Sequence, residues 1–133
     1  MNYYKKKQFT HELTKEAKTL RFTVETSISA EVIENIIVGA LESTSTYWVG
    51  LDNTTPEWKN KPEDFPTSQY ATQLLLEGKN ITLYDIENEE EVWELNLQKV
   101  LKGIGIAFAN GDDIEDDTDN ILQYALFGEL VYG

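Results

Sequence analysis

The sequence of 133 residues has no cysteine, a single histidine and no glycine-rich phosphate loop. Without cysteine, disulfides, thiolate nucleophiles and cysteine-bound zinc are excluded. A Ser–His–acid triad would have to use His11, which lies in a polar, basic stretch that we expect to be solvated. The stretch Gly103-Ile104-Gly105 fits neither P-loop nor dinucleotide-binding spacing. These absences favour a binding protein without cofactor or metal over an enzyme.

Long apolar runs are missing as well. No segment approaches the roughly 18 consecutive apolar residues of a membrane span. The basic start, Lys5–Lys7, resembles the first region of a signal peptide, but the residues that follow it up to residue 21 are mostly polar. We therefore expect no membrane contact and a protein that stays in the cytoplasm of the cell that makes it.

Positive charge is scarce and unevenly placed. The chain has 11 Lys and Arg against 24 Asp and Glu, a formal net charge of -13. Residues 1–21 have a balance of +4, residues 22–79 of -6 and residues 80–133 of -11. Phosphate contacts need Lys and Arg, so direct binding of nucleic acid is disfavoured and a partner with a basic surface is favoured.

Hydrophobic periodicity predicts the fold class. Residues 1–19 are polar and basic and predict an appendage, whereas the patterns in residues 20–133 predict one α+β domain. Alternating apolar residues predict strands at 20–25, 80–86, 92–97 and, at an edge, 129–132. Stripes at helical spacing predict helices at 30–43, 68–77, 97–109 and 120–127. We expect a small antiparallel sheet of about three to four strands packed against three to four helices.

Several details of these elements can be predicted. Ser27 or Ser29 is expected to cap the first helix, Ser68 the second, and Thr118 or Asp119 the last. Gly78 is expected to end the second helix. The hairpin should pair Ile81 and Leu83 with Trp93 and Leu95 on one face, with residues 87–91 as its turn. The helix at 97–109 should bury the apolar positions Leu97, Val100, Leu101, Ile104 and Phe108. Its two glycines, Gly103 and Gly105, suit close packing against another element.

The acidic run at residues 112–119 has part of a calcium-loop pattern. Asp113, Glu115 and Asp117 stand at the first, third and fifth positions. Thr118 replaces the required glycine and Tyr124 replaces the bidentate glutamate, so this is not an EF-hand. A solvated loop preceding a helix explains the run more simply.

Carboxylates also recur at every second residue in two places, 85–89 and 113–119. In extended backbone such side chains share a face and lie roughly 6.6 Å apart, similar to the spacing of phosphates along a nucleic-acid strand. A patch of this kind is a nucleic-acid mimic that can occupy a Lys/Arg groove and displace its ligand. The competing interpretation is that the acidity only serves solubility.

The candidate partner-binding residues are these carboxylates and one tryptophan. Trp58 lies in a polar segment, residues 52–67, that contains all three prolines, and an exposed Trp there would suit an interface anchor. The expected contact residues are Asp85, Glu87, Glu89, Glu90, Glu91, Asp112, Asp113, Glu115, Asp116, Asp117 and Trp58.

Four segments resemble small acidic proteins encoded by phages and integrated mobile elements of Gram-positive bacteria. The most specific is the C-terminal run DNILQYALFGELVYG, residues 119–133. The others are Ala40-Leu41-Glu42 with Tyr47-Trp48, the hairpin residues Gly78, Thr82, Tyr84, Asp85 and Glu87, and Val100-Leu101-Lys102-Gly103. The resemblance covers about residues 20–133. It implies a bacterial host cell but no catalytic residues, because the family has no assigned activity.

This context, together with the charge, suggests a non-enzymatic inhibitor. The expected partner is the basic surface of a host nucleic-acid-binding defence protein, and a CRISPR effector such as Cas9 fits best, which would make the chain an anti-CRISPR protein. Two alternatives stay open. One is an accessory structural or regulatory protein of a phage or mobile element, and the other is a small carboxylate- or metal-dependent hydrolase.

Overall fold

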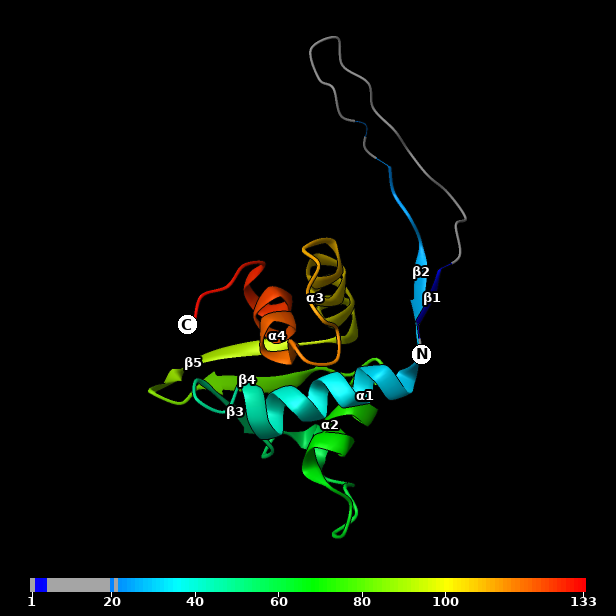
Figure 1. The fold of residues 1–133 in the computed structure, drawn as a ribbon. Coiled ribbons are helices and arrows are strands. Elements are labelled where there is room, and N and C mark those ends of the chain that lie inside the picture. The colour runs from blue at the N-terminus through cyan, green and yellow to red at the C-terminus, as the bar shows by residue number, and fades with distance from the viewer. Residues whose placement is uncertain (1, 5–19, 21) are drawn as a thin grey trace. The chain divides into compact units, whose positions relative to one another are not determined.

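The computed structural model describes residues 2–4, 20 and 22–133 (Figure 1). The chain divides into two units, Met1–Val32 and Ile33–Gly133, which are described separately. Most of the predicted appendage, including His11, lies outside the described residues. The boundary between the two units falls inside the first helix, whereas the predicted one falls after residue 19.

The first unit contains a short antiparallel pair of strands. Strand β1 (Asn2–Tyr4) pairs with β2 (Thr26–Ile28), with Tyr3 opposite Ser27. The predicted half-buried strand over residues 20–25 is wrong for the described part, because the strand begins only at Thr26 and the side chains of Leu20 and Phe22 are exposed. Alternation produces a half-buried strand only where another layer covers its apolar side.

Helix α1 (Ala30–Gly39) begins and packs as its sequence predicts. The Oγ atom of Ser29 accepts a hydrogen bond from the backbone N–H of Val32 at 3.2 Å, which confirms Ser29 as a cap. Within the second unit, Ile36 and Ile37 are buried on one face of the helix. A wider π-helical turn, η1 (Ala40–Thr44), continues it.

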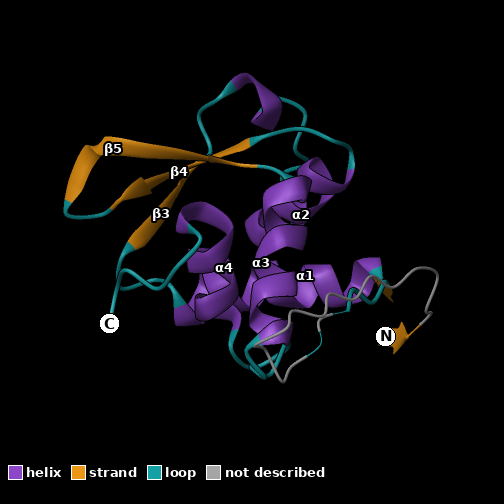
Figure 2. Ribbon diagram, turned by 90° about the horizontal axis from the view of Figure 1, so that it is seen from above, coloured by secondary structure: helices purple, strands orange, loops and turns teal. Residues whose placement is uncertain are grey.

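Three strands form the sheet of the second unit. They are β3 (Val49–Asp52), β4 (Ile81–Asp85) and β5 (Asn88–Leu95), antiparallel and in the order β3-β4-β5. The predicted register is confirmed, because Ile81 pairs with Leu95 and Leu83 with Trp93. Ile81, Leu83 and Leu95 are buried, and Figure 2 shows the three strands of this sheet in orange.

The hairpin turn is shorter than predicted. Asp85 pairs with Asn88, so the turn consists of Ile86 and Glu87, and residues 89–91 belong to β5. The register shifts between Tyr84 and Asp85, which leaves residues 89–91 as an irregular bulge. The prediction differs because the chain reverses within two residues, so the glutamates that follow Glu87 belong to the second strand and not to the turn.

Helix α2 (Thr67–Leu76) is shifted by one residue from the predicted range 68–77 and has a different cap. Its N-cap is Pro66, and the hydroxyl of Ser68 donates to the carboxylate of Glu42 instead of capping, so that prediction is wrong. Gly78 ends the helix as predicted, with φ at 85°. The N–H groups of Gly78 and Lys79 donate to the last carbonyls, at 3.0 and 2.9 Å.

Helices α3 (Leu97–Ala109) and α4 (Thr118–Phe127) pack closely against each other. The range of α3 agrees with the prediction, but its predicted buried face is partly wrong. The buried residues are Val100, Gly103 and Ala107, whereas Leu101 and Phe108 are 38% and 44% exposed. The cause is Gly103, which lies against the backbone of α4 and thereby turns a different face of α3 inward.

The C-terminal segment is not the predicted edge strand. The Oε1 atom of Gln123, in α4, accepts hydrogen bonds from the backbone N–H groups of Val131 and Tyr132 at 2.7 and 2.8 Å. A side-chain amide therefore takes the place of a neighbouring strand. None of the described helices has both the length and the apolar character needed to cross a membrane.

Gly103→Ala should destabilise the protein. A Cβ at this position would lie 2.5 Å from the carbonyl oxygen of Ile121 and 2.9 Å from the backbone nitrogen of Ala125, so α3 and α4 would have to move apart. We expect a loss of about 1–3 kcal/mol in the free energy of unfolding, measured by urea denaturation.

Gly105→Ala is the matched control in the same helix. Its Cβ would meet no atom within 4 Å, so the exchange should stabilise by about 0.5–1 kcal/mol through helix propensity. Equal effects of the two exchanges would show that helix contact does not decide the cost at Gly103.

Candidate functional site

The end of the β4–β5 hairpin gathers exposed acidic side chains. We define the acidic hairpin as Glu87, Glu89, Glu90 and Glu91, all of which are exposed. Two apolar side chains flank them, Ile86 and Val92, at 41% and 56% exposure. The hairpin therefore combines negative charge with apolar surface, as the contact area of a protein partner often does.

The charge of this region has little internal compensation. Residues 80–133 have a balance of -11, and their two cations are Lys99 and Lys102. The Nζ atom of Lys99 donates to the backbone oxygen of Glu94 at 2.6 Å, not to a carboxylate. Within the described residues, the ion pair that forms joins Lys79 to Glu77, outside this region. The carboxylates of the acidic hairpin are thus exposed, and none of them forms an ion pair with a cation of residues 2–4, 20 or 22–133, the part of the chain that the structure describes.

Asp85, which was predicted as a contact residue together with these glutamates, accepts hydrogen bonds within the fold. Its Oδ1 accepts from the backbone N–H of Glu87 at 2.8 Å, and its Oδ2 accepts from the hydroxyl of Tyr132 at 2.9 Å. The bond from Glu87 and then that from Tyr132 lower the pKa of Asp85. Asp85 therefore anchors the hairpin turn and the C-terminal segment.

The acidic loop at residues 112–117 does not have the predicted extended spacing. The Oδ1 of Asp113 accepts from the backbone N–H groups of Glu115 and Asp116 at 3.0 and 3.1 Å, and the Oδ2 of Asp117 accepts from Asp113 at 2.7 Å. These bonds wind the loop into turns, so carboxylates two residues apart do not line one extended face. Asp113 and Asp117 stabilise the turn, while Glu115 and Asp116 remain exposed.

The partial calcium pattern gains no structural support from the described residues. In that part of the chain no three Asp, Glu or His side chains converge in a way that could hold a metal ion. Asp112 instead accepts a hydrogen bond from the amide of Asn120 at 3.3 Å. The loop acids are arranged to cap backbone and side-chain donors.

The acidic hairpin and the acidic loop lie apart. In both views the hairpin turn is at the free end of the sheet, whereas the connection between α3 and α4 lies beside the helices (Figures 1 and 2). The predicted contact residues therefore form two separate groups.

Trp58 is not the exposed anchor that its sequence context predicts. It ends the 3-10 turn η2 (Pro56–Trp58) and is only 7% exposed. Its ring centroid lies 5.4 Å from that of Tyr70, and Phe65 contacts the same tyrosine at 5.9 Å. These aromatic contacts fold the proline-containing segment back onto α2 and bury the indole.

A cluster around Asp119 was missed by the sequence analysis. The carboxylate accepts hydrogen bonds from four side chains: the hydroxyl of Ser45 at 2.7 Å, the indole of Trp48 at 2.8 Å, the hydroxyl of Tyr47 at 2.9 Å and the amide of Gln123 at 3.0 Å. Thr118 or Asp119 was predicted to cap the last helix, which is wrong, because the N-cap is Asp117 and both residues lie in the first turn of α4. A position in a first helical turn gave no sign of partners about 70 residues earlier.

The C-terminal segment closes over this cluster. The ring of Tyr132 stacks on Trp48 with centroids 4.5 Å apart and planes at 11°, and Phe127 lies 5.6 Å from the same indole. The amide of Gln123, itself buried, also donates to the backbone oxygen of Tyr132 at 3.1 Å. Residues from two of the segments that carry the resemblance, Tyr47-Trp48 and the C-terminal run, therefore meet here, which gives those residues a structural role.

Two tyrosines in this region have raised pKa values. Burial, followed by the hydrogen bond to Asp119, raises the pKa of Tyr47. Burial raises the pKa of Tyr132 to about 12, with further contributions from the hydrogen bond to Asp85 and the negative charges of Glu91 and Glu87. Both hydroxyls therefore stay protonated and donate at neutral pH.

Comparison with known proteins gives no relative. No protein-family model matches the chain, and neither a curated protein nor a solved structure matches it.

Asp119→Asn should destabilise the protein by about 2–3 kcal/mol. A hydrogen bond to a charged group contributes about 1.5–3 kcal/mol, and an Asn side chain would turn an NH₂ group toward donors that need an acceptor. Urea denaturation measures the change. The matched control is Asp116→Asn, an exposed loop acid, which should stay within about 0.5 kcal/mol of the wild type. A cost at Asp119 no greater than at Asp116 would contradict the role of the cluster.

Tyr132 should make the protein sensitive to alkaline pH. Its folded pKa of about 12 lies above the ordinary value of 10.0, so its contribution to stability is fully present below pH 10.0 and is lost as the pH rises through 12. The wild type should therefore lose more of its free energy of unfolding than Tyr132→Phe between about pH 9 and pH 12. Parallel losses in the two proteins would show that this hydroxyl is not responsible.

Proposed function

We propose that this protein is a non-enzymatic inhibitor that binds a basic, nucleic-acid-binding partner protein through its acidic hairpin. The single observation that supports this most is the group Glu87, Glu89, Glu90 and Glu91. These residues are exposed together at the end of the sheet, and none of them pairs with a cation among the residues that the structure describes. A Lys/Arg groove that normally holds phosphates is the surface such a group complements.

The mechanism is exclusion of the nucleic acid by competition for the same cations. Carboxylates on a protruding hairpin neutralise the Lys and Arg side chains that phosphates would otherwise contact, while the body of the protein blocks the groove sterically. The partner's cations attract the carboxylates and the phosphates electrostatically, so binding of the inhibitor weakens as the salt concentration rises.

The hairpin is a better contact than the acidic loop. Asp113 and Asp117 already accept backbone hydrogen bonds, whereas the carboxylates of Glu89, Glu90 and Glu91 project from a strand end and take no part in the turn. A carboxylate that is free of internal bonds can be desolvated against a partner cation without breaking the fold. The proposed contact surface therefore contains fewer residues than the sequence alone suggested.

The proposed partner class follows from charge and from the resemblance to phage and mobile-element proteins. A host defence nuclease must hold nucleic acid along a basic channel, and a CRISPR effector is the member of this class that the resemblance favours. The acidic hairpin would occupy part of that channel.

Neutralising the hairpin should weaken inhibition without unfolding the protein. The variant is Glu89→Gln, Glu90→Gln and Glu91→Gln together, and the readout is displacement of fluorescently labelled DNA from a purified CRISPR effector complex. Exposed ion pairs contribute about 0.2–1 kcal/mol each, so the loss of three should weaken the apparent affinity by about threefold to a hundredfold. Raising the salt concentration should weaken wild-type inhibition in the same assay.

The matched control removes three other exposed acids from the loop before α2: Glu57→Gln, Glu63→Gln and Asp64→Asn. Its net charge equals that of the hairpin variant, so a general charge effect would weaken both equally. Full inhibition by the hairpin variant, or no displacement by the wild type, would sink the proposal.

A further inference from the structure

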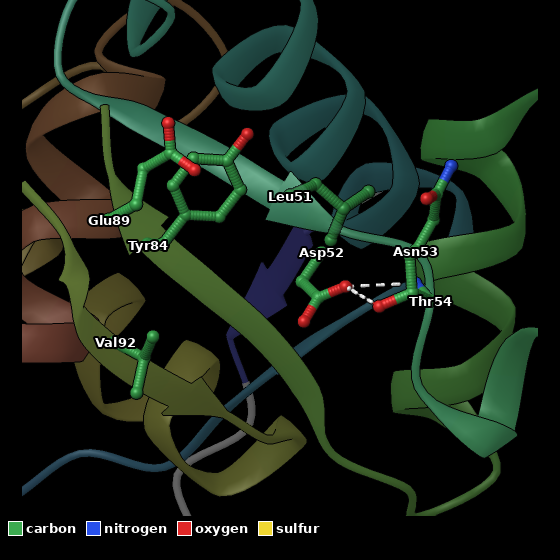
Figure 3. A pocket seen from close by; sticks show the side chains of 7 residues that line it. All are labelled: Leu51, Asp52, Asn53, Thr54, Tyr84, Glu89 and Val92. Atoms are coloured by element: carbon green, nitrogen blue, oxygen red, sulfur yellow. Dashed lines mark hydrogen bonds between the residues drawn. The ribbon is translucent and has the colours of Figure 1, made fainter. Parts of the chain in front are cut away.

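A shallow pocket lies on the sheet face whose side chains alternate with the buried ones (Figure 3). Its volume is about 320 Å³, and its walls come from the end of β3, from Tyr84 in β4 and from Glu89 and Val92 in β5. Ligand pockets start at about 300 Å³, so this one suits a single long side chain better than a larger molecule.

The ring of Tyr84 forms the floor between the strands. Tyr84 pairs with Gly50 across the sheet, and a Cβ on Gly50 would lie 2.4 Å from the Cζ atom of the ring. The missing side chain thus lets the aromatic ring lie directly on the β3 backbone. The ring remains partly exposed, so it offers a π surface inside the pocket.

Carboxylates stand on opposite walls of this floor. On the β3 side, the Oδ1 of Asp52 accepts from both the N–H and the hydroxyl of Thr54, at 2.9 and 2.5 Å (Figure 3). These bonds fix the orientation of Asp52, and the hydroxyl of Thr54 is the main reason why its pKa is lowered. On the β5 side stands Glu89. No basic residue is among the described residues that line the pocket.

We propose that this pocket receives an arginine side chain of the partner protein. The identity of the occupant, a side chain of the partner protein, rests on the proposed function. The proposal adds the site at which that side chain is recognised. A planar guanidinium can stack on the ring of Tyr84 while its N–H groups reach the carboxylates of Asp52 and Glu89. The exposed methyl groups of Val92 cover the aliphatic part of the same side chain.

The pocket explains a selectivity that the acidic hairpin alone does not provide. Attraction between net charges treats lysine and arginine alike. Stacking on a tyrosine ring and two-point contact with carboxylates favour the flat, forked guanidinium over the compact ammonium of lysine. A preference for arginine at equal charge is therefore the signature of this site.

The test uses two peptides of equal length, each with four cations separated by glycine and serine, one with arginine and one with lysine. Titration into isotopically labelled protein is followed by NMR. The arginine peptide should shift the ring signals of Tyr84 and the methyl signals of Val92, and should bind about two- to fivefold more tightly than the lysine peptide, as expected for one exposed cation–π contact.

Two variants separate the ring from the charge. Tyr84→Leu removes the aromatic face and should bring the arginine-to-lysine preference close to one. Tyr84→Phe keeps the ring and should retain the preference. Both leave every carboxylate in place, so general attraction of the peptides should persist.

Equal binding of the two peptides by the wild type, or an unchanged preference in Tyr84→Leu, would overturn the proposal. If Tyr84→Leu does not fold, the wild-type titration decides, since unmoved Tyr84 and Val92 signals would overturn it equally. The DNA-displacement assay is independent of this result. Displacement without arginine preference counts against the pocket alone, and arginine preference without displacement counts against the proposed inhibition alone.

Discussion

The hydrogen bonds to the carboxylate of Asp119 are the interaction on which most of the second unit's structure depends. It joins the first turn of α4 to Ser45 and Trp48, in the turn before β3, and to Gln123, which holds the C-terminal backbone. A charged acceptor partly shielded from water makes strong hydrogen bonds, and bonds that share one acceptor support each other. One side chain thereby joins a helix, the turn before the sheet and the last residues of the chain, and Tyr132 stacks on Trp48, one of its partners.

The acidic residues of this protein divide into two kinds. Asp85, Asp113, Asp117 and Asp119 accept hydrogen bonds inside the fold, where their negative charge stabilises turns and the Asp119 cluster. The glutamates at residues 89–91 project from the end of the sheet. Aspartate is short enough to reach nearby backbone donors, whereas a longer glutamate on an exposed strand reaches outward. The second kind supports the proposed contact with a basic partner.

Local patterns predicted much of the fold, because helix and strand periodicity depend on neighbouring residues. The range of α3, the register of Ile81 with Leu95 and the end of α2 at Gly78 were all predicted correctly. Predictions failed where distant contacts competed with a local pattern. Gln123 replaced a strand at the C-terminus, and the contact of Trp58 with Tyr70 buried the predicted anchor.

The sequence by itself determined the absence of disulfides, the large negative charge and its concentration in residues 80–133, since composition and order settle these. Only the tertiary structure decided which carboxylates accept hydrogen bonds, because several of the donors lie far away in the sequence. The bond from Trp48 to Asp119 spans 71 residues. The tertiary structure also decided that the ring of Tyr84 lies on Gly50, beside Asp52 and Glu89, since strand pairing brings together residues that no local pattern connects.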